Sequence, residues 1–116
     1  MFALGGPVAA ATFDLPATPK TGAWGHYAAG AAPAITTKSG DTVVMHTLLT
    51  NSPAGLEKAG VAPADVEPAL RAVFDGVPAA DRGPGGHILT GPVAIEGAEP
   101  GDTLEVRILR VDLAIP

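Results

Sequence analysis

The stretch of residues 83–108, GPGGHILTGPVAIEGAEPGDTLEVRI, carries the clearest structural pattern in this chain. Its EPGD segment at 99–102 places proline second and glycine third in a four-residue turn, as a type II turn requires. Residues 103–108 then alternate between polar and apolar side chains, which is typical of a half-buried strand. After residue 108 the alternation shifts by one, which indicates a bulge or a strand that changes sheets. This stretch predicts a mainly β fold.

The composition also favours short strands joined by many turns. The chain of 116 residues contains 15 Gly and 12 Pro without a repeat period. We therefore expect a single domain: a β-sandwich or jelly-roll-like domain over residues 34–116, preceded by an irregular amino-terminal arm over residues 1–33. Residues 42–49 are expected to form a central strand, because both of its faces are largely apolar.

One short α-helix is predicted at about residues 65–75. Asp65 is the expected N-cap and Gly76 follows the last turn. The apolar spacing that predicts the helix is formed by Val66, Leu70, Val73 and Phe74. This face is expected to lie on the sheet.

Charge and hydropathy exclude several classes of partner. The formal net charge is -5 and the basic residues are not clustered, so we expect neither nucleic acid nor a membrane surface as a partner. No apolar run reaches membrane-spanning length, and the first residues lack the pattern of a signal peptide. A cytoplasmic location is the resulting expectation.

The residues that follow the glycine-rich segment resemble a known family. His87, the TGP segment at 90–92, the GAEPGD segment at 97–102 and the LEV segment at 104–106 are similar to a recurring block of the acetamidase/formamidase family. Upstream, the WGHY segment at 24–27, Pro33, the SGDTV segment at 39–43 and the HT segment at 46–47 are similar to the opening of that family. The resemblance implies hydrolysis of the carbon–nitrogen bond of small linear amides, with release of ammonia. Family members are roughly two to three times longer, so this chain is expected to be an amino-terminal portion.

The side chains available limit how an amide could be hydrolysed. The chain has no cysteine, and Ser39 and Ser52 lie in turn or loop sequences that lack the context of an activated serine. The remaining route is water activated by a divalent metal ion, with zinc as the expected ion. His87 and His46 are the candidate ligands; a hydrogen bond to a loop carbonyl for His87, and a core or interface position for His46, are the structural alternatives.

The candidate catalytic acids are Glu96 and Glu99, each of which could transfer protons to the leaving nitrogen. A solvated surface position is the alternative for Glu96, and a place in the turn is the alternative for Glu99. The structural turn itself is assigned to Gly97, Pro100, Gly101 and Asp102, with the carboxylate of the aspartate bound to turn amides.

Two other classes of function are considered. A non-catalytic β-sandwich that acts as a scaffold or oligomerisation module would need no complete set of catalytic residues. A cupredoxin-like or cupin-like metal domain is disfavoured, because cysteine and closely spaced histidine pairs are absent from the sequence. The expected partners are a small amide and either further copies of the chain or a second chain that completes the site, and we expect the isolated chain to self-associate.

Overall fold

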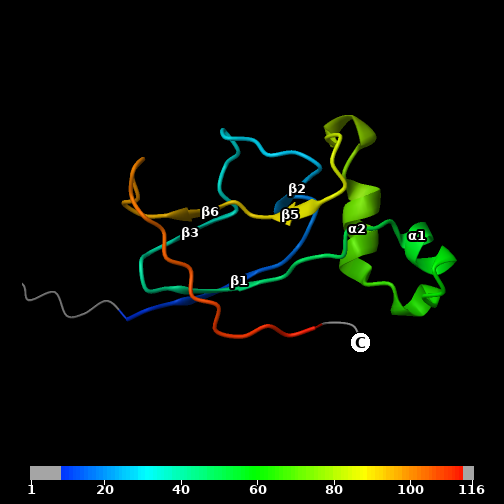
Figure 1. Cartoon of the computed structure of the whole chain (residues 1–116), viewed down its shortest axis with the longest axis horizontal. Helices are drawn as coiled ribbons and strands as arrows, with labels where there is room; N and C mark the ends of the chain where they lie inside the picture. Colours follow the sequence, from blue (N-terminus) through cyan, green and yellow to red (C-terminus); the bar gives the residue numbers. More distant parts are fainter. Residues whose placement is uncertain (1–8, 114–116) are drawn as a thin grey trace, which may run out of the picture.

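The computed structural model describes residues 9–113 as six short strands, two helices and two short 3-10 turns (Figure 1). The strands β1 to β4 come first and β5 and β6 follow the helices. In chain order the elements are β1 Thr12–Leu15, β2 Gly22–Trp24, β3 Ile35–Thr37, β4 Thr42–Met45, α1 Pro53–Lys58, the 3-10 turn Pro63–Asp65, α2 Pro68–Gly76, the 3-10 turn Ala79–Asp81, β5 Ile88–Thr90 and β6 Val93–Ile95.

The strands pair in three separate two-stranded sheets. β1 and β4 are parallel, with Thr12 opposite Thr42 and Leu15 opposite Met45. β2 and β5 are antiparallel, and β3 and β6 are parallel. The fold is therefore strand-rich, with small sheets and one main helix. No helix among the described residues is long and apolar enough to cross a membrane.

The region expected to be an irregular arm, residues 1–33, contains two strands in its described part. β1 pairs with β4 and β2 pairs with β5, so both partners lie far along the chain. A strand whose pairing is this distant leaves only a faint local pattern, and the four residues of β1 are too few to show a convincing period. Residues 1–8 of the expected arm lie outside the described part of the chain.

The helical region differs from the prediction in its details. Asp65 ends the 3-10 turn, and α2 begins at Pro68 with Glu67 at the N-cap position, where no side chain caps the helix. Gly76 is the last residue of α2. A further helix, α1, occupies a segment that was expected to be a loop, because the Ser52 hydroxyl accepts a hydrogen bond from the amide of Gly55 and Pro53 starts the first turn.

The strand predicted at residues 103–108 does not form. Residues 102–113 belong to no helix or strand, and their backbone runs past the sheets without joining a ladder (Figure 1). The central strand expected at 42–49 ends at Met45, and its sheet has two members. Alternation of side chains shows only that a segment suits a sheet, and within residues 9–113 the segment 103–108 has no neighbouring strand to pair with.

The buried core is small and lies around α2. Leu70 is fully buried, and Val66, Val73, Leu15 and Ala17 are at most 7% exposed. Leu70 and Val73 of the predicted apolar stripe are buried on α2, whereas Val66 is buried but precedes the helix. The ring of Phe74 packs against the ring of Trp24 of β2 at an interplanar angle of 57°, with the ring centres 5.5 Å apart. Contact between these rings holds α2 against the β2–β5 sheet.

Arg82 stabilises the same contact between α2 and β2. Its guanidinium lies over the ring of Trp24 at 4.3 Å and over the ring of Phe74 at 4.8 Å. It also donates hydrogen bonds to the carbonyl oxygens of Phe74 and Val77, at 2.5 Å and 2.8 Å. These carbonyls lie at the end of α2, where a cation is favourable. One side chain therefore joins the helix, the strand β2 and the loop that leads to β5.

The glycine-rich segment at 83–86 allows two backbones to touch. The amide of Gly83 donates to the carbonyl of Trp24 at 2.8 Å, and the amide of Gly85 donates to the carbonyl of Gly25 at 3.0 Å. A Cβ on Gly25 would lie 2.3 Å from the carbonyl oxygen of Gly85, and the residue has a φ of +74°. The glycines therefore permit a close approach between two backbone segments.

Replacing Leu70 by alanine is expected to destabilise the fold by about 2–5 kcal/mol, because the core is too small to close around the lost atoms. Urea unfolding followed by circular dichroism measures this free energy. Leu49→Ala is the matched control, since that side chain is 44% exposed, and it should cost far less. Equal losses for the two variants would contradict the position assigned to the core.

Asp41 ties the turn before β4 to the start of β1. Its carboxylate accepts hydrogen bonds from the amide of Ala11 at 2.8 Å and from the amide of Lys38 at 2.7 Å. These two bonds, that of Ala11 first, hold the pKa of Asp41 below its ordinary value. Because the pKa is lower in the folded chain, the stabilisation is present above the unfolded value and is lost as the pH falls through the folded value.

Asp41→Asn is therefore expected to lower the stability at neutral pH, and the difference from the unmodified chain should shrink as the pH falls below about 4. Urea unfolding at pH 7 and at stepwise lower pH provides the comparison. A difference that stays constant over the whole range would show that ionised Asp41 contributes nothing to the fold.

Candidate functional site

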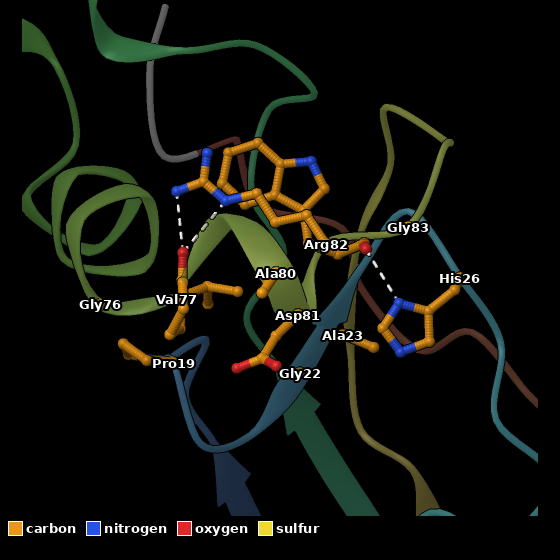
Figure 2. Close-up of a pocket in the computed structure, with 12 residues that line it drawn as sticks. Pro19, Gly22, Ala23, His26, Gly76, Val77, Ala80, Asp81, Arg82 and Gly83 are labelled. Atoms are coloured by element: carbon orange, nitrogen blue, oxygen red, sulfur yellow. Dashed lines mark hydrogen bonds between the residues drawn. The ribbon is translucent and has the colours of Figure 1, made fainter.

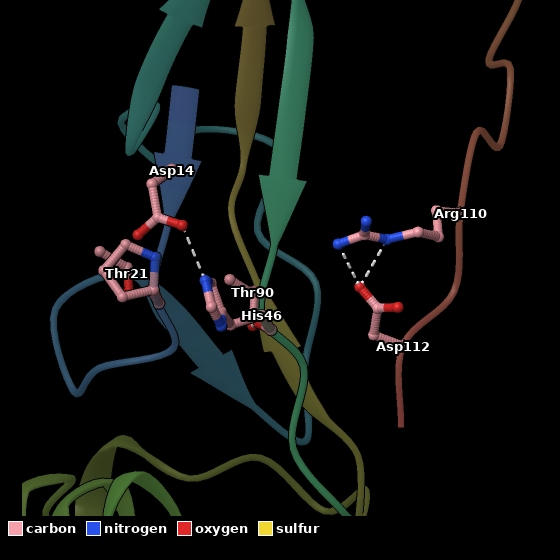
Figure 3. A network of polar contacts seen from close by, with 7 residues as sticks. Asp14, Thr21, His46, Thr90, Arg110 and Asp112 are labelled. Atoms are coloured by element: carbon pink, nitrogen blue, oxygen red, sulfur yellow. Dashed lines mark hydrogen bonds and ion pairs between the residues drawn. The ribbon is translucent and has the colours of Figure 1, made fainter. Parts of the chain in front are cut away.

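The side chains of Asp14 and His46 meet beside the β1–β4 sheet. The parallel register places Asp14 opposite Val44, and His46 follows β4 by one residue with its amide bound to the carbonyl of Leu15 at 3.0 Å. His46 Nε2 and Asp14 Oδ1 are 2.8 Å apart (Figure 3). The side chains are 54% and 67% exposed, so the pair is open to solvent and to small molecules.

The backbone of His46 is also fixed from the other side. Thr90, at the end of β5, donates its hydroxyl to the carbonyl oxygen of His46 at 2.8 Å (Figure 3). The next amide, that of Gly91, donates to the carbonyl of Thr21 at 2.8 Å. Two sheets thus hold the histidine, and this rigid support suits a side chain with a chemical role.

The pairing of Asp14 and His46 assigns a role to each ring nitrogen. An ionised carboxylate only accepts hydrogen bonds, so in the neutral imidazole Nε2 carries the proton and Nδ1 has a free lone pair. A histidine oriented in this way can take a proton from water and later give it to a leaving group. The carboxylate stabilises the imidazolium that forms in between.

A hollow of about 300 Å³ lies next to His46. Two carboxylates, those of Glu67 and Asp112, belong to its lining, and Arg110 pairs with Asp112 at 2.7 Å (Figure 3). The rest of the lining is mostly apolar and is formed by Ala17, Met45, Thr47, Leu48, Leu49, Ala69 and Leu113. This volume lies at the lower end of the range of small-molecule pockets.

His87 lies in a different environment. Its Nδ1 is 3.2 Å from the Thr50 hydroxyl, and its carbonyl accepts a hydrogen bond from the amide of Gly25 at 2.8 Å. Among residues 9–113 no three His, Cys, Asp or Glu side chains come close enough together to hold a metal ion. A zinc ion bound by His87 or His46 would need further ligands.

The candidate acid Glu96 lies away from the Asp14–His46 pair. Glu96 is 3.8 Å from Lys38 in an ion pair of exposed side chains, and its amide donates to the carbonyl of Thr37. Lys38 precedes β4 and His46 follows it, so Glu96 and the histidine lie at opposite ends of this strand. The structure does not bring Glu96 together with His46.

Glu99 belongs to a tight turn. Its amide donates to the carboxylate of Asp102 at 2.9 Å, and its carbonyl accepts from the amide of Asp102 at 3.1 Å. Gly101 has a φ of +100°, as the third position of a type II turn requires, and Gly97 has a φ of +81°. Asp102 thus holds the turn together through both its side chain and its amide.

A second and larger hollow, of about 530 Å³, lies beside Arg82 (Figure 2). Arg82 is engaged by the two aromatic rings and by the carbonyls at the end of α2. His26 lies in the same lining, with Nδ1 3.0 Å from the carbonyl oxygen of Trp24. Both side chains already have partners in the fold, so this hollow is the weaker candidate.

Asp14 was not predicted from the sequence as a partner of His46. The aspartate lies in the part of the chain that was expected to be irregular, 32 residues from the histidine. The only signal is the short alternation of the TFDL segment, which places Asp14 on the face opposite to Phe13 and Leu15.

Comparisons of the chain with protein families, with curated proteins and with solved structures found no match.

Proposed function

We propose that this chain provides the proton-transfer residues of a hydrolase that cleaves the carbon–nitrogen bond of small linear amides. The observation that carries the proposal is the hydrogen bond of 2.8 Å between Asp14 and His46 beside a small hollow. The resemblance of residues 87–106 to the acetamidase/formamidase block supplies the reaction class. A cytoplasmic location belongs to the same proposal.

The proposed reaction uses the free Nδ1 of His46 as the base. As a water molecule attacks the amide carbonyl, its proton moves to Nδ1 and Asp14 stabilises the resulting imidazolium. The tetrahedral intermediate then collapses, the proton passes from His46 to the amide nitrogen, and the carbon–nitrogen bond breaks. One amide and one water give one carboxylic acid and one ammonia.

The hollow suits a short substrate. Its apolar lining, which includes Met45, Leu48 and Leu49, would accept the alkyl end of an amide such as acetamide. Glu67 and Asp112 lie in the same lining and can accept hydrogen bonds from the NH₂ group. We expect formamide and acetamide to fit.

The test is ammonia release from formamide and acetamide by the purified chain, with added Zn²⁺ and after chelation. His46→Ala is expected to abolish the release, and Asp14→Asn to reduce it about 100-fold because the imidazole loses its orientation and its countercharge. His26→Ala is the matched control, since His26 binds the carbonyl of Trp24 outside this hollow. Release that survives His46→Ala would exclude His46 as the base.

The second candidate function is a non-catalytic module for scaffolding or oligomerisation. It is favoured by the exposed apolar side chains of residues 104–113, among which Ile108 is 80% exposed and Leu113 is 85% exposed. We propose that the small sheets of this chain become part of a β-sandwich or jelly-roll-like domain in such an assembly. Absence of ammonia release under every condition, together with stable association, would select this function.

A further inference from the structure

The segment of residues 103–109 has the side chains of a strand and no partner. Leu104, Val106 and Ile108 are 64%, 73% and 80% exposed. Thr103, Glu105 and Arg107 alternate with them, so an extended backbone places the three apolar side chains on one face and the polar ones on the other. The backbone groups of this segment are not part of any sheet within residues 9–113.

The order of opposite charges along the segment would allow it to pair with the same segment of a second copy. Arg107 donates a hydrogen bond to Glu105 of the same chain, and Arg110 pairs with Asp112 in the same manner. All four side chains are at least 68% exposed, so these pairs have little stabilising effect in the single chain. Each pair holds opposite charges two residues apart, with one apolar residue, Val106 or Val111, between them.

We propose that residues 103–109 form an antiparallel ladder with the same segment of a second copy of this chain, centred on Val106. The twofold axis then places Glu105 of each copy opposite Arg107 of the other. Leu104 lies opposite Ile108, and the two Val106 side chains face each other. This inference does not depend on amide hydrolysis.

Symmetry restricts the possible registers. Neighbouring pairs in an antiparallel ladder alternate between two hydrogen-bonding types, so an exact twofold axis must pass through a residue paired with itself. Centring on Glu105 or on Arg107 would place like charges directly opposite each other, which is destabilising. Centring on Val106 pairs both charges with their opposites and keeps Leu104, Val106 and Ile108 on one face.

The register centred on Val111 satisfies the same charge rule by pairing Arg110 with Asp112. Asp112 and Leu113, however, already line the hollow next to His46. Residues 103–109 do not line this hollow, and this difference favours Val106 as the centre.

The pairing occupies one backbone edge of the segment. A free strand edge is a template for uncontrolled association, and a symmetric pair closes this edge on itself. Because the contact is made between identical segments, the assembly ends at two copies unless another edge is used.

Sedimentation velocity of the full chain over a range of concentrations tests the proposal. The unmodified chain is expected to be a dimer, and Glu105→Arg should raise the dissociation constant at least about tenfold because it places arginines opposite each other twice. The exchanged variant Glu105→Arg/Arg107→Glu restores both opposite pairs and should restore the dimer. Circular dichroism unfolding should show that all variants keep the fold, since none of these residues is buried.

Asp112→Arg is the matched control, because it makes the same change of charge outside the proposed ladder and should leave the dimer intact. A monomer at every concentration would overturn the proposal. It would also be overturned if Asp112→Arg dissociates the dimer while Glu105→Arg does not, or if the exchanged variant stays monomeric.

Discussion

Each strand in the described part of this chain has one hydrogen-bonded neighbour, and the rest of the structure depends on how these two-stranded sheets are covered. A lone pair of strands is marginally stable in water, so each pair needs a surface to pack against. For β2 and β5 that surface is α2. The helix is held there by the contact of Phe74 with Trp24 and by Arg82, whose guanidinium lies over both rings. For β1 and β4 it is the small core around Leu15.

The predictions from sequence succeed where the interaction is local. The main helix and the turn at 99–102 arise from residues close together in the chain. The failures involve distant partners: β1 and β2 escaped notice because they pair with residues about 30 and 66 positions later. The alternation of residues 103–108 is clear in the sequence, but a strand forms only when a second strand is present.

In the candidate site, too, single residues could be predicted from the sequence but their distant partners could not. His46 stands out in the sequence because its ring can transfer protons or bind metal ions at neutral pH. Its partner Asp14 was not predicted, since the contact exists only once β1 lies alongside β4. Glu96 was selected for its charge alone, and the fold places it beside Lys38 at the other end of β4. A sequence therefore indicates which side chains can act, whereas strand pairing decides which of them meet.

The central claim is that the fold leaves residues 103–109 open for pairing with a second strand. Amide hydrogen–deuterium exchange, measured on the full chain at low and at high concentration, tests this claim directly. We expect the amides of this segment to exchange rapidly in dilute solution and to become protected as the concentration rises, while those of β1 and β4 stay equally protected throughout. Rapid exchange of residues 103–109 at every concentration would contradict the account.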